Sequence, residues 1–133
     1  MKTFLDSGVL LTAWKRGEHH ERAVSLLDED SGEFVTCDNV RLELLPKPAF
    51  EKRHAEIEFY NAHFQKTSKC EPFSEALGQA ALALAKKYGL AAGDALNLAS
   101  AIRQGADEFI TSELPSKPMF RVAGIKVRSL HAY

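Results

Sequence analysis

The alternation of short apolar runs with helical segments constrains the fold of this chain more than any other feature of its sequence. The apolar runs predict strands at residues 3–5, 34–36, 70–72, 108–111 and 125–127. Apolar residues at helical spacing predict helices at residues 7–14, 19–27, 50–64, 75–88 and 94–104, and a short helix that ends at residue 45. Such alternation is typical of a parallel sheet with helices on both faces. We therefore expect an α/β fold.

Local signals mark the ends of the short helix that precedes the middle of the chain. Asp38 or Asn39 can cap its start, because a short polar side chain there accepts a hydrogen bond from a free backbone N–H. Pro46 and Pro48 are expected to end it, because proline lacks the N–H that a helix interior needs. The helix is thus predicted to be brief and closely bounded.

Length and composition predict one globular domain that spans residues 1–133. Apolar residues make up 45% of the chain and charged residues 26%, which excludes a disordered tail. No apolar run approaches the ~20 residues that a membrane-spanning helix needs, and the first residues lack the pattern of a secretory signal. Cys37 and Cys70 are too few and too far apart for a disulfide framework. We interpret them as reduced thiols in a cytoplasmic protein.

The net charge of −1 limits how this chain could bind nucleic acid. Proteins that hold nucleic acid by charge alone are usually strongly basic. A nearly neutral chain that acts on a phosphodiester must gain positive charge from a bound cation, a local basic patch or a basic partner. Composition does not choose among these three sources.

Acidic residues fall where the predicted strands end, which is where ligands bind in open parallel sheets. Asp6 follows the first strand, and Glu113 lies two residues after the strand that ends at Thr111. Asp94 opens a helix, and Glu43 lies within a short apolar helix. Each acid also has an ordinary interpretation. Asp6 and Asp94 could be helix caps, while Glu43 and Glu113 could lie on a solvated helix face and in a loop.

Four stretches of the sequence resemble the PIN domain family, and most closely its VapC-type toxins of toxin–antitoxin pairs. They are residues 4–11 (FLDSGVLL), 41–44 (RLEL), 93–101 (GDALNLASA) and 106–113 (ADEFITSE). The third stretch is the most specific, and together they extend over nearly the whole chain. The resemblance implies a Rossmann-like, three-layer fold with a central parallel sheet flanked by helices.

The resemblance also implies a Mg²⁺- or Mn²⁺-dependent endoribonuclease that hydrolyses RNA, with an antitoxin protein and a homodimer as expected partners. The acids that would be catalytic and would bind the metal are Asp6, Glu43, Asp94 and Glu113. Ser7 and Thr111 match supporting hydroxyl positions. Hard cations such as Mg²⁺ prefer oxygen ligands, so a carboxylate cluster suits them. Such a cation can activate water and neutralise phosphate charge without a histidine base.

Two departures from the family pattern leave an alternative open. The fourth acid is usually Asp, whereas this chain has Glu113, and Gly8 stands where the family often has Asn or Ser. A catalytically degenerate PIN protein that binds RNA or protein is therefore the competing hypothesis. A haloacid dehalogenase phosphatase also has an Asp after its first strand. It requires a second Asp at the position of Gly8, which excludes it.

Other side chains are candidates for contacts outside the acids. Basic residues that could hold an RNA backbone are Lys15, Arg16, Lys117 and Arg121. Residues 40–64 carry more large apolar groups than two helices readily bury, which favours an antitoxin groove or a dimer contact there. The five histidines, including the adjacent His19 and His20, show no ligand spacing and are interpreted as surface residues.

Overall fold

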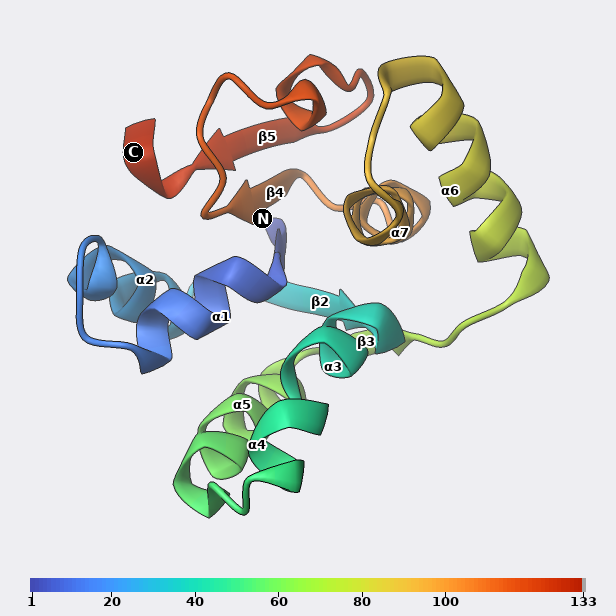
Figure 1. Cartoon of the computed structure of the whole chain (residues 1–133). Coiled ribbons are helices and arrows are strands. Elements are labelled where there is room, and N and C mark those ends of the chain that lie inside the picture. Colours follow the sequence, from blue (N-terminus) through green and yellow to red (C-terminus); the bar gives the residue numbers. More distant parts are fainter. Residues whose placement is uncertain (133) are drawn as a thin grey trace.

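The protein is built around a five-stranded sheet with the strand order β3-β2-β1-β4-β5, and all of its strand pairings are parallel. The computed structural model describes residues 1–132 (Figure 1). The strands are β1 (Lys2–Leu5), β2 (Glu33–Cys37), β3 (Lys69–Glu71), β4 (Glu108–Thr111) and β5 (Lys126–Ser129). From β1 the sheet grows in one direction through β2 and in the other through β4. The carboxyl end of β1 therefore lies at a topological switch point, where such sheets bind ligands.

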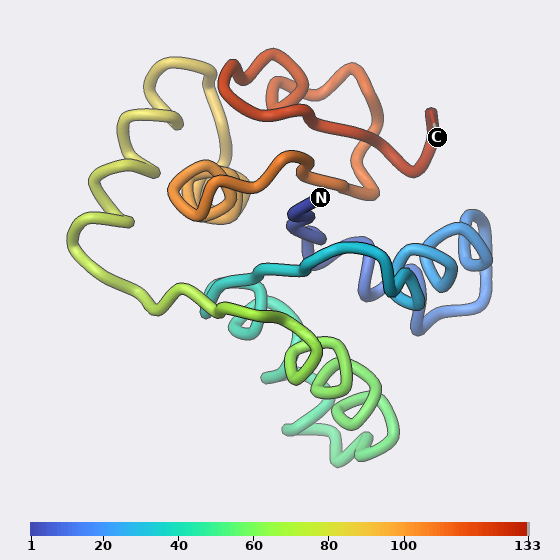
Figure 2. The backbone as a smooth tube through the Cα atoms, turned by 180° about the vertical axis from the view of Figure 1, so that it is seen from behind, coloured from blue at the N-terminus to red at the C-terminus, as the bar shows by residue number. Residues whose placement is uncertain are grey.

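Helices cover both faces of the sheet, so the fold has three layers. The helices are α1 (Ser7–Trp14), α2 (His20–Leu27), α3 (Asp38–Leu44), α4 (Pro46–Phe50), α5 (His54–Lys66), α6 (Glu75–Tyr88) and α7 (Ala92–Arg103). The 3₁₀ helices are η1 (Pro118–Arg121) and η2 (Leu130–Ala132). Figures 1 and 2 show α1 and α2 on one face, α6 and α7 on the other, and α3 to α5 beyond β2 and β3. The predicted three-layer α/β fold with a parallel sheet is confirmed.

The central strands are apolar on both sides because both of their faces are covered. Phe4 of β1 and Phe109 of β4 are paired in register and stack with their ring centroids 5.4 Å apart. Leu5, Val35 and Ile110 are also buried. This core holds the carboxyl ends of β1 and β4 side by side.

The region around α3 and α4 differs from the sequence-based expectation. α3 ends at Leu44, but Pro46 then begins α4, because proline is well suited to the first turn of a helix. Cys37 is the N-cap of α3, so neither Asp38 nor Asn39 caps it. The helix expected at residues 50–64 begins at His54 and ends at Lys66.

Some of the large apolar groups of residues 40–64 are buried, and others are exposed. Tyr60 and Leu44 are buried, whereas Phe50 belongs to α4 and is 89% exposed. Cys37 is buried and Cys70 is partly exposed, and neither forms a disulfide in the structure. Within residues 1–132, no helix has the length and apolar character to cross a membrane.

Candidate active site

Asp6 lies at the carboxyl end of β1 and has hydrogen-bond donors on both carboxylate oxygens. It caps α1, where Oδ1 accepts from the Ser7 backbone N–H at 3.0 Å. The same oxygen accepts from Asn97 Nδ2 at 2.9 Å, and Oδ2 accepts from the Thr111 hydroxyl at 3.0 Å. The ordinary interpretation as a cap is therefore correct, but Asp6 is only 6% exposed and also receives donors from α7 and β4.

Asn97 of α7 joins two of the acids. Its Nδ2 donates to Asp6 Oδ1 and, at 2.8 Å, to Oε1 of Glu43 on α3. Its own Oδ1 accepts from Asn39 Nδ2 at 3.0 Å and from the Cys37 thiol at 3.4 Å. Asn97 is 1% exposed, so these bonds fix its amide. Sequence reasoning missed this residue, although it lies one helical turn after Asp94, on the same face of α7.

Asp94 and Glu113 complete the acidic group. Asp94 does not cap α7, because the N-cap is Ala91 and Asp94 lies in the first turn. Burial raises the pKa of Asp94, and the nearby charges of Glu113 and Glu43 raise it further. The positive charge of Lys117 acts in the opposite direction. These effects bring three of the predicted acids and one of the predicted basic residues into one electrostatic environment.

The pKa of the Asp6 carboxyl is raised to about 7, and burial is the largest cause of this shift. The charges of Glu43 and Asp94 also raise it, while the hydrogen bonds from Thr111 and Asn97 lower it. Crowded carboxylates repel one another in a low dielectric, and a proton or a cation relieves that repulsion. The structure therefore brings together all four acids that the sequence singled out.

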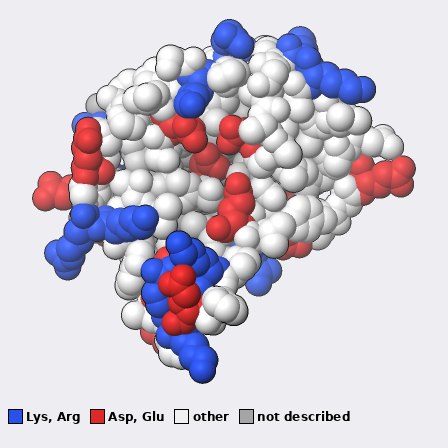
Figure 3. Space-filling view, in the orientation of Figure 1, with Lys and Arg blue, Asp and Glu red and all other residues white. Residues whose placement is uncertain are grey.

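The oxygen atoms of the four acids form a donor set that suits a hydrated hard cation. Within residues 1–132, no three of these four acids have ligand oxygens that all lie within 4.8 Å of one another. Mg²⁺ usually keeps several waters and takes only one or two carboxylates directly. The donor set consists of oxygen atoms, which fits Mg²⁺ or Mn²⁺. Figure 3, drawn in the orientation of Figure 1, shows Asp and Glu side chains near the centre of the molecule. Lys and Arg side chains lie toward its outline, together with further acidic ones.

Two glycines leave room for side chains at the site. A Cβ on Gly93 would lie 2.8 Å from Glu43 Oε2, so the absent side chain lets Glu43 approach the start of α7. A Cβ on Gly8 would lie 2.0 Å from the Ser112 hydroxyl. The space that a residue larger than glycine would take at position 8 is thus filled by a hydroxyl from the segment after β4. A polar group from Ser112 therefore lies beside position 8.

The segment after β4 is held by hydrogen bonds at both ends of Glu113. Its backbone N–H donates to the Thr111 hydroxyl at 3.2 Å, and its carbonyl accepts from the Ser129 hydroxyl at 2.5 Å. Ser7 contributes its backbone N–H to Asp6, as described above. Of the other basic residues, Lys15 follows the far end of α1, about 12 Å along an eight-residue helix from Asp6. Of the four basic candidates, Lys117 lies close enough to Asp94 for its charge to lower the pKa of that carboxyl.

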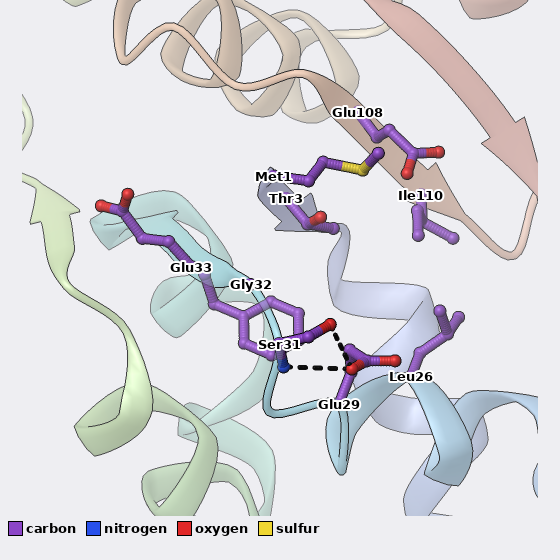
Figure 4. A pocket seen from close by; sticks show the side chains of 10 residues that line it. Met1, Thr3, Leu26, Glu29, Ser31, Gly32, Glu33, Glu108 and Ile110 are labelled. Atoms are coloured by element: carbon purple, nitrogen blue, oxygen red, sulfur yellow. Dashed lines mark hydrogen bonds between the residues drawn. The ribbon is translucent and has the colours of Figure 1, made fainter.

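A cavity of about 220 Å³ lies elsewhere, beside the end of α2 (Figure 4). Its lining includes Met1, Thr3, Leu26 and Glu29. The Glu29 carboxylate accepts hydrogen bonds from the backbone N–H and the hydroxyl of Ser31. None of the four acids lines this cavity. It therefore has no part in the candidate site.

Comparisons with known proteins agree with this geometry. The family profile described as PIN domain matches residues 3–113. No curated protein sequence is significantly similar to the chain. Solved structures of similar fold include VapBC2 from Rickettsia felis bound to a DNA fragment from its promoter. The matching chain there is 15% identical with a TM-score of 0.72, and the alignment covers 97% of this chain and 98% of that one.

Two further complexes contain a chain of the same fold. A toxin–antitoxin complex from Klebsiella pneumoniae has a chain 18% identical with a TM-score of 0.72, covering 98% of this chain and 99% of that one. FitAcB from Neisseria gonorrhoeae has a chain 19% identical with a TM-score of 0.68, with the same coverage of 98% and 99%. At these identities the likeness shows the fold alone.

Proposed function

Because this chain belongs to the PIN domain family, we propose that it is a metal-dependent endoribonuclease and the toxin of a toxin–antitoxin pair. The observation that carries the proposal is the gathering of Asp6, Glu43, Asp94 and Glu113 beside the switch point of the sheet, with a raised pKa at two of them. A structural cluster of acids would be costly to maintain, whereas a metal-binding cluster gains from the same charges.

The chain's own residues would prepare the site in distinct ways. Asp6, Glu43, Asp94 and Glu113 would hold Mg²⁺ or Mn²⁺, one or two of them directly and the others through its bound waters. The bound ion would supply an activated water and neutralise charge on the phosphate. Thr111 and Asn97 hold the Asp6 carboxylate, which reduces the reorganisation that metal binding requires.

RNA would be oriented by groups around the acids. Lys117 acts on Asp94 electrostatically, so its ammonium would lie close enough to contact a phosphate beside the metal. A small positive contribution of this kind agrees with a chain whose net charge is −1. The RNA sequence that is cut would be set by contacts that vary among the surface loops.

The partners of this chain would be an antitoxin protein and a second copy of the chain. The solved complexes of similar fold support the antitoxin. Exposed Leu42 and Phe50 on α3 and α4 offer apolar contacts near the site. A small adjacent open reading frame whose product co-purifies with the chain would support the toxin assignment. Light scattering of the purified chain measures whether it is a dimer.

The nuclease is tested by RNA cleavage with a single charge removed. Glu43→Gln keeps the oxygen that accepts from Asn97 but removes a metal ligand, so cleavage in Mg²⁺ or Mn²⁺ should fall ~10²-fold or more. Glu58→Gln on α5 is the matched control, because it is also an exposed helical glutamate and should leave cleavage unchanged. Absence of metal-dependent cleavage in the wild type would favour the degenerate binding module instead.

A further inference from the structure

We propose that Glu18, His19 and His131 form a second cation site, one that binds Zn²⁺ or a similar borderline transition metal. Glu18 and His19 belong to the segment between α1 and α2, and His131 belongs to η2 near the other end of the chain. Figure 1 shows the C-terminal turn beside the start of α2. Within residues 1–132, this is the one group of three His, Cys, Asp or Glu residues with ligand atoms all within 4.8 Å of one another.

Two of the three distances in this cluster are close to those between ligands of a tetrahedral zinc ion, and the third, between Glu18 and His131, is within 4.8 Å. His19 Nε2 lies 3.2 Å from Glu18 Oε1 and 3.3 Å from His131 Nδ1. Zn–N and Zn–O bonds of about 2.0–2.2 Å place neighbouring ligand atoms about 3.3–3.5 Å apart in a tetrahedron. The Glu18 side chain is 81% exposed, so it can adjust its position at little cost. Water would take the fourth position.

Direct hydrogen bonds cannot join all three groups at once, and without a cation the exposed Glu18 carboxylate is solvated by water. His19 Nε2 carries at most one proton, so it can donate fully to Glu18 or to His131 but not to both. If Nε2 has no proton, His131 can donate to it, but the Glu18 carboxylate then faces a lone pair. A cation resolves this conflict because it accepts electron pairs from all three ligand atoms at once.

Backbone contacts hold His131 in place and leave its ring nitrogens available, and its ring packs against that of His19. The His131 backbone N–H donates to the Ser129 hydroxyl at 3.0 Å, and Arg22 of α2 donates to the Leu130 carbonyl. These bonds dock η2 against α2. The rings of His19 and His131 meet edge to face with centroids 4.6 Å apart. The docking therefore brings together two imidazoles that are 112 residues apart in sequence.

His20 provides an internal control, because it is adjacent to His19 but points to other partners. Its Nδ1 donates to the Lys15 carbonyl at 2.8 Å and also lies 3.3 Å from the Thr12 carbonyl. A nonspecific histidine effect would involve His20 as much as its neighbour. A site at Glu18, His19 and His131 would not involve it.

The test is calorimetric titration of Zn²⁺ into the full chain, with excess Mg²⁺ present and repeated in an Asp94→Asn background. Wild type and His20→Ala should bind one zinc ion per chain. His131→Ala and His19→Asn should each lose at least tenfold in affinity. Asn is chosen at position 19 because the backbone there is left-handed (φ 66°), and Asn tolerates that conformation. Circular dichroism checks that each variant is folded.

Spectroscopy and melting give independent readouts of the same proposal. Co²⁺ in place of Zn²⁺ should give the visible absorption of a tetrahedral site in wild type and His20→Ala, and His131→Ala should lose it. Zn²⁺ should raise the melting temperature of wild type but not of His131→Ala, because the ion ties η2 to the α1–α2 segment. Unchanged zinc affinity in both His19→Asn and His131→Ala, an equal loss in His20→Ala, or no zinc binding at all would overturn the proposal.

Discussion

The acidic site and the Glu18–His19–His131 cluster lie toward opposite ends of α1 and differ in almost every physical respect. The acidic site gathers oxygen ligands from separate elements beside the switch point, and buried Asn97 fixes two of them. The cluster has two nitrogens and one oxygen on the surface, with a single hydrogen bond between its histidines. Crowded carboxylates around the buried Asp6 thus characterise the proposed catalytic site, whereas the cluster depends on how η2 docks against α2.

Replacing Asp94 with Asn should separate the two sites most sharply. Loss of a metal ligand should lower RNA cleavage in Mg²⁺ or Mn²⁺ by ~10²–10³-fold. Without metal, the melting temperature should hold or rise, because one of several repelling charges is gone. Cleavage assays and melting curves with and without Mn²⁺ measure both effects, and zinc affinity at the histidines should not change. An active Asp94→Asn enzyme would contradict the nuclease mechanism.

The pH dependence of metal-free stability should report on Asp6. Its pKa is about 7 in the folded chain and near 3.8 when unfolded, so the folded state holds an extra proton between these values. The free energy of unfolding should therefore fall as pH rises from about 4 to 7, by up to ~1.4 kcal/mol per pH unit, and level off above. Urea unfolding in EDTA measures this slope, and Asp6→Asn should flatten it. An equal slope in both proteins would mean that another group titrates.

Removing the Asn97 amide should weaken the acidic site without removing an acid. Asn97→Ala leaves Asp6 and Glu43 without a shared donor and should cost ~1–3 kcal/mol of unfolding free energy. Because Asn97 holds Asp6 and Glu43 in place for the metal, saturating Mn²⁺ should stabilise the variant less than it stabilises wild type. Urea unfolding of both proteins with and without Mn²⁺ measures the difference, and an equal stabilisation would mean that the amide serves packing alone.

A methyl group on Gly93 should have the smallest effect on the acidic site. Its Cβ would lie 2.8 Å from Glu43 Oε2, so the carboxylate must move, and cleavage should fall about tenfold. Gly78→Ala is the matched control, because Gly78 lies within α6 and its Cβ would meet nothing within 4 Å. That control should gain up to ~1 kcal/mol of stability from helix propensity and keep full cleavage. Equal cleavage in both variants would show that the Glu43 carboxylate can move away from the added methyl group without loss of activity.

The sequence predicts the fold and the proximity of two of the acids for the same reason, while the family resemblance supplied the other two. Apolar periodicity predicts strands and helices, and the ends of parallel strands lie at one edge of the sheet, so Asp6 and Glu113 could be expected close together. Pro46 was misread because proline both ends one helix and begins another. Asn97 was missed because a helical asparagine has no distinctive pattern until its partners are known. Its one available signal was its position one turn after Asp94.

The histidine cluster could not be predicted from local spacing. Metal sites are usually recognised from ligands a few residues apart, and His19 and His131 are separated by most of the chain. His20 is adjacent to His19 in sequence, but it donates to a backbone carbonyl and has no part in the cluster. The ligand set depends on the docking of η2 against α2, and docking is a tertiary property.

Ser129 gives the two sites a shared thermodynamic link. Its hydroxyl accepts from the His131 backbone and donates to the Glu113 carbonyl, so an ion at the histidines would restrict the segment that carries the fourth acid. Coupling of this kind is reciprocal: if Zn²⁺ raises the affinity for Mn²⁺ by some factor, Mn²⁺ must raise the affinity for Zn²⁺ by the same factor. The chain would then respond to the supply of one metal through its affinity for another.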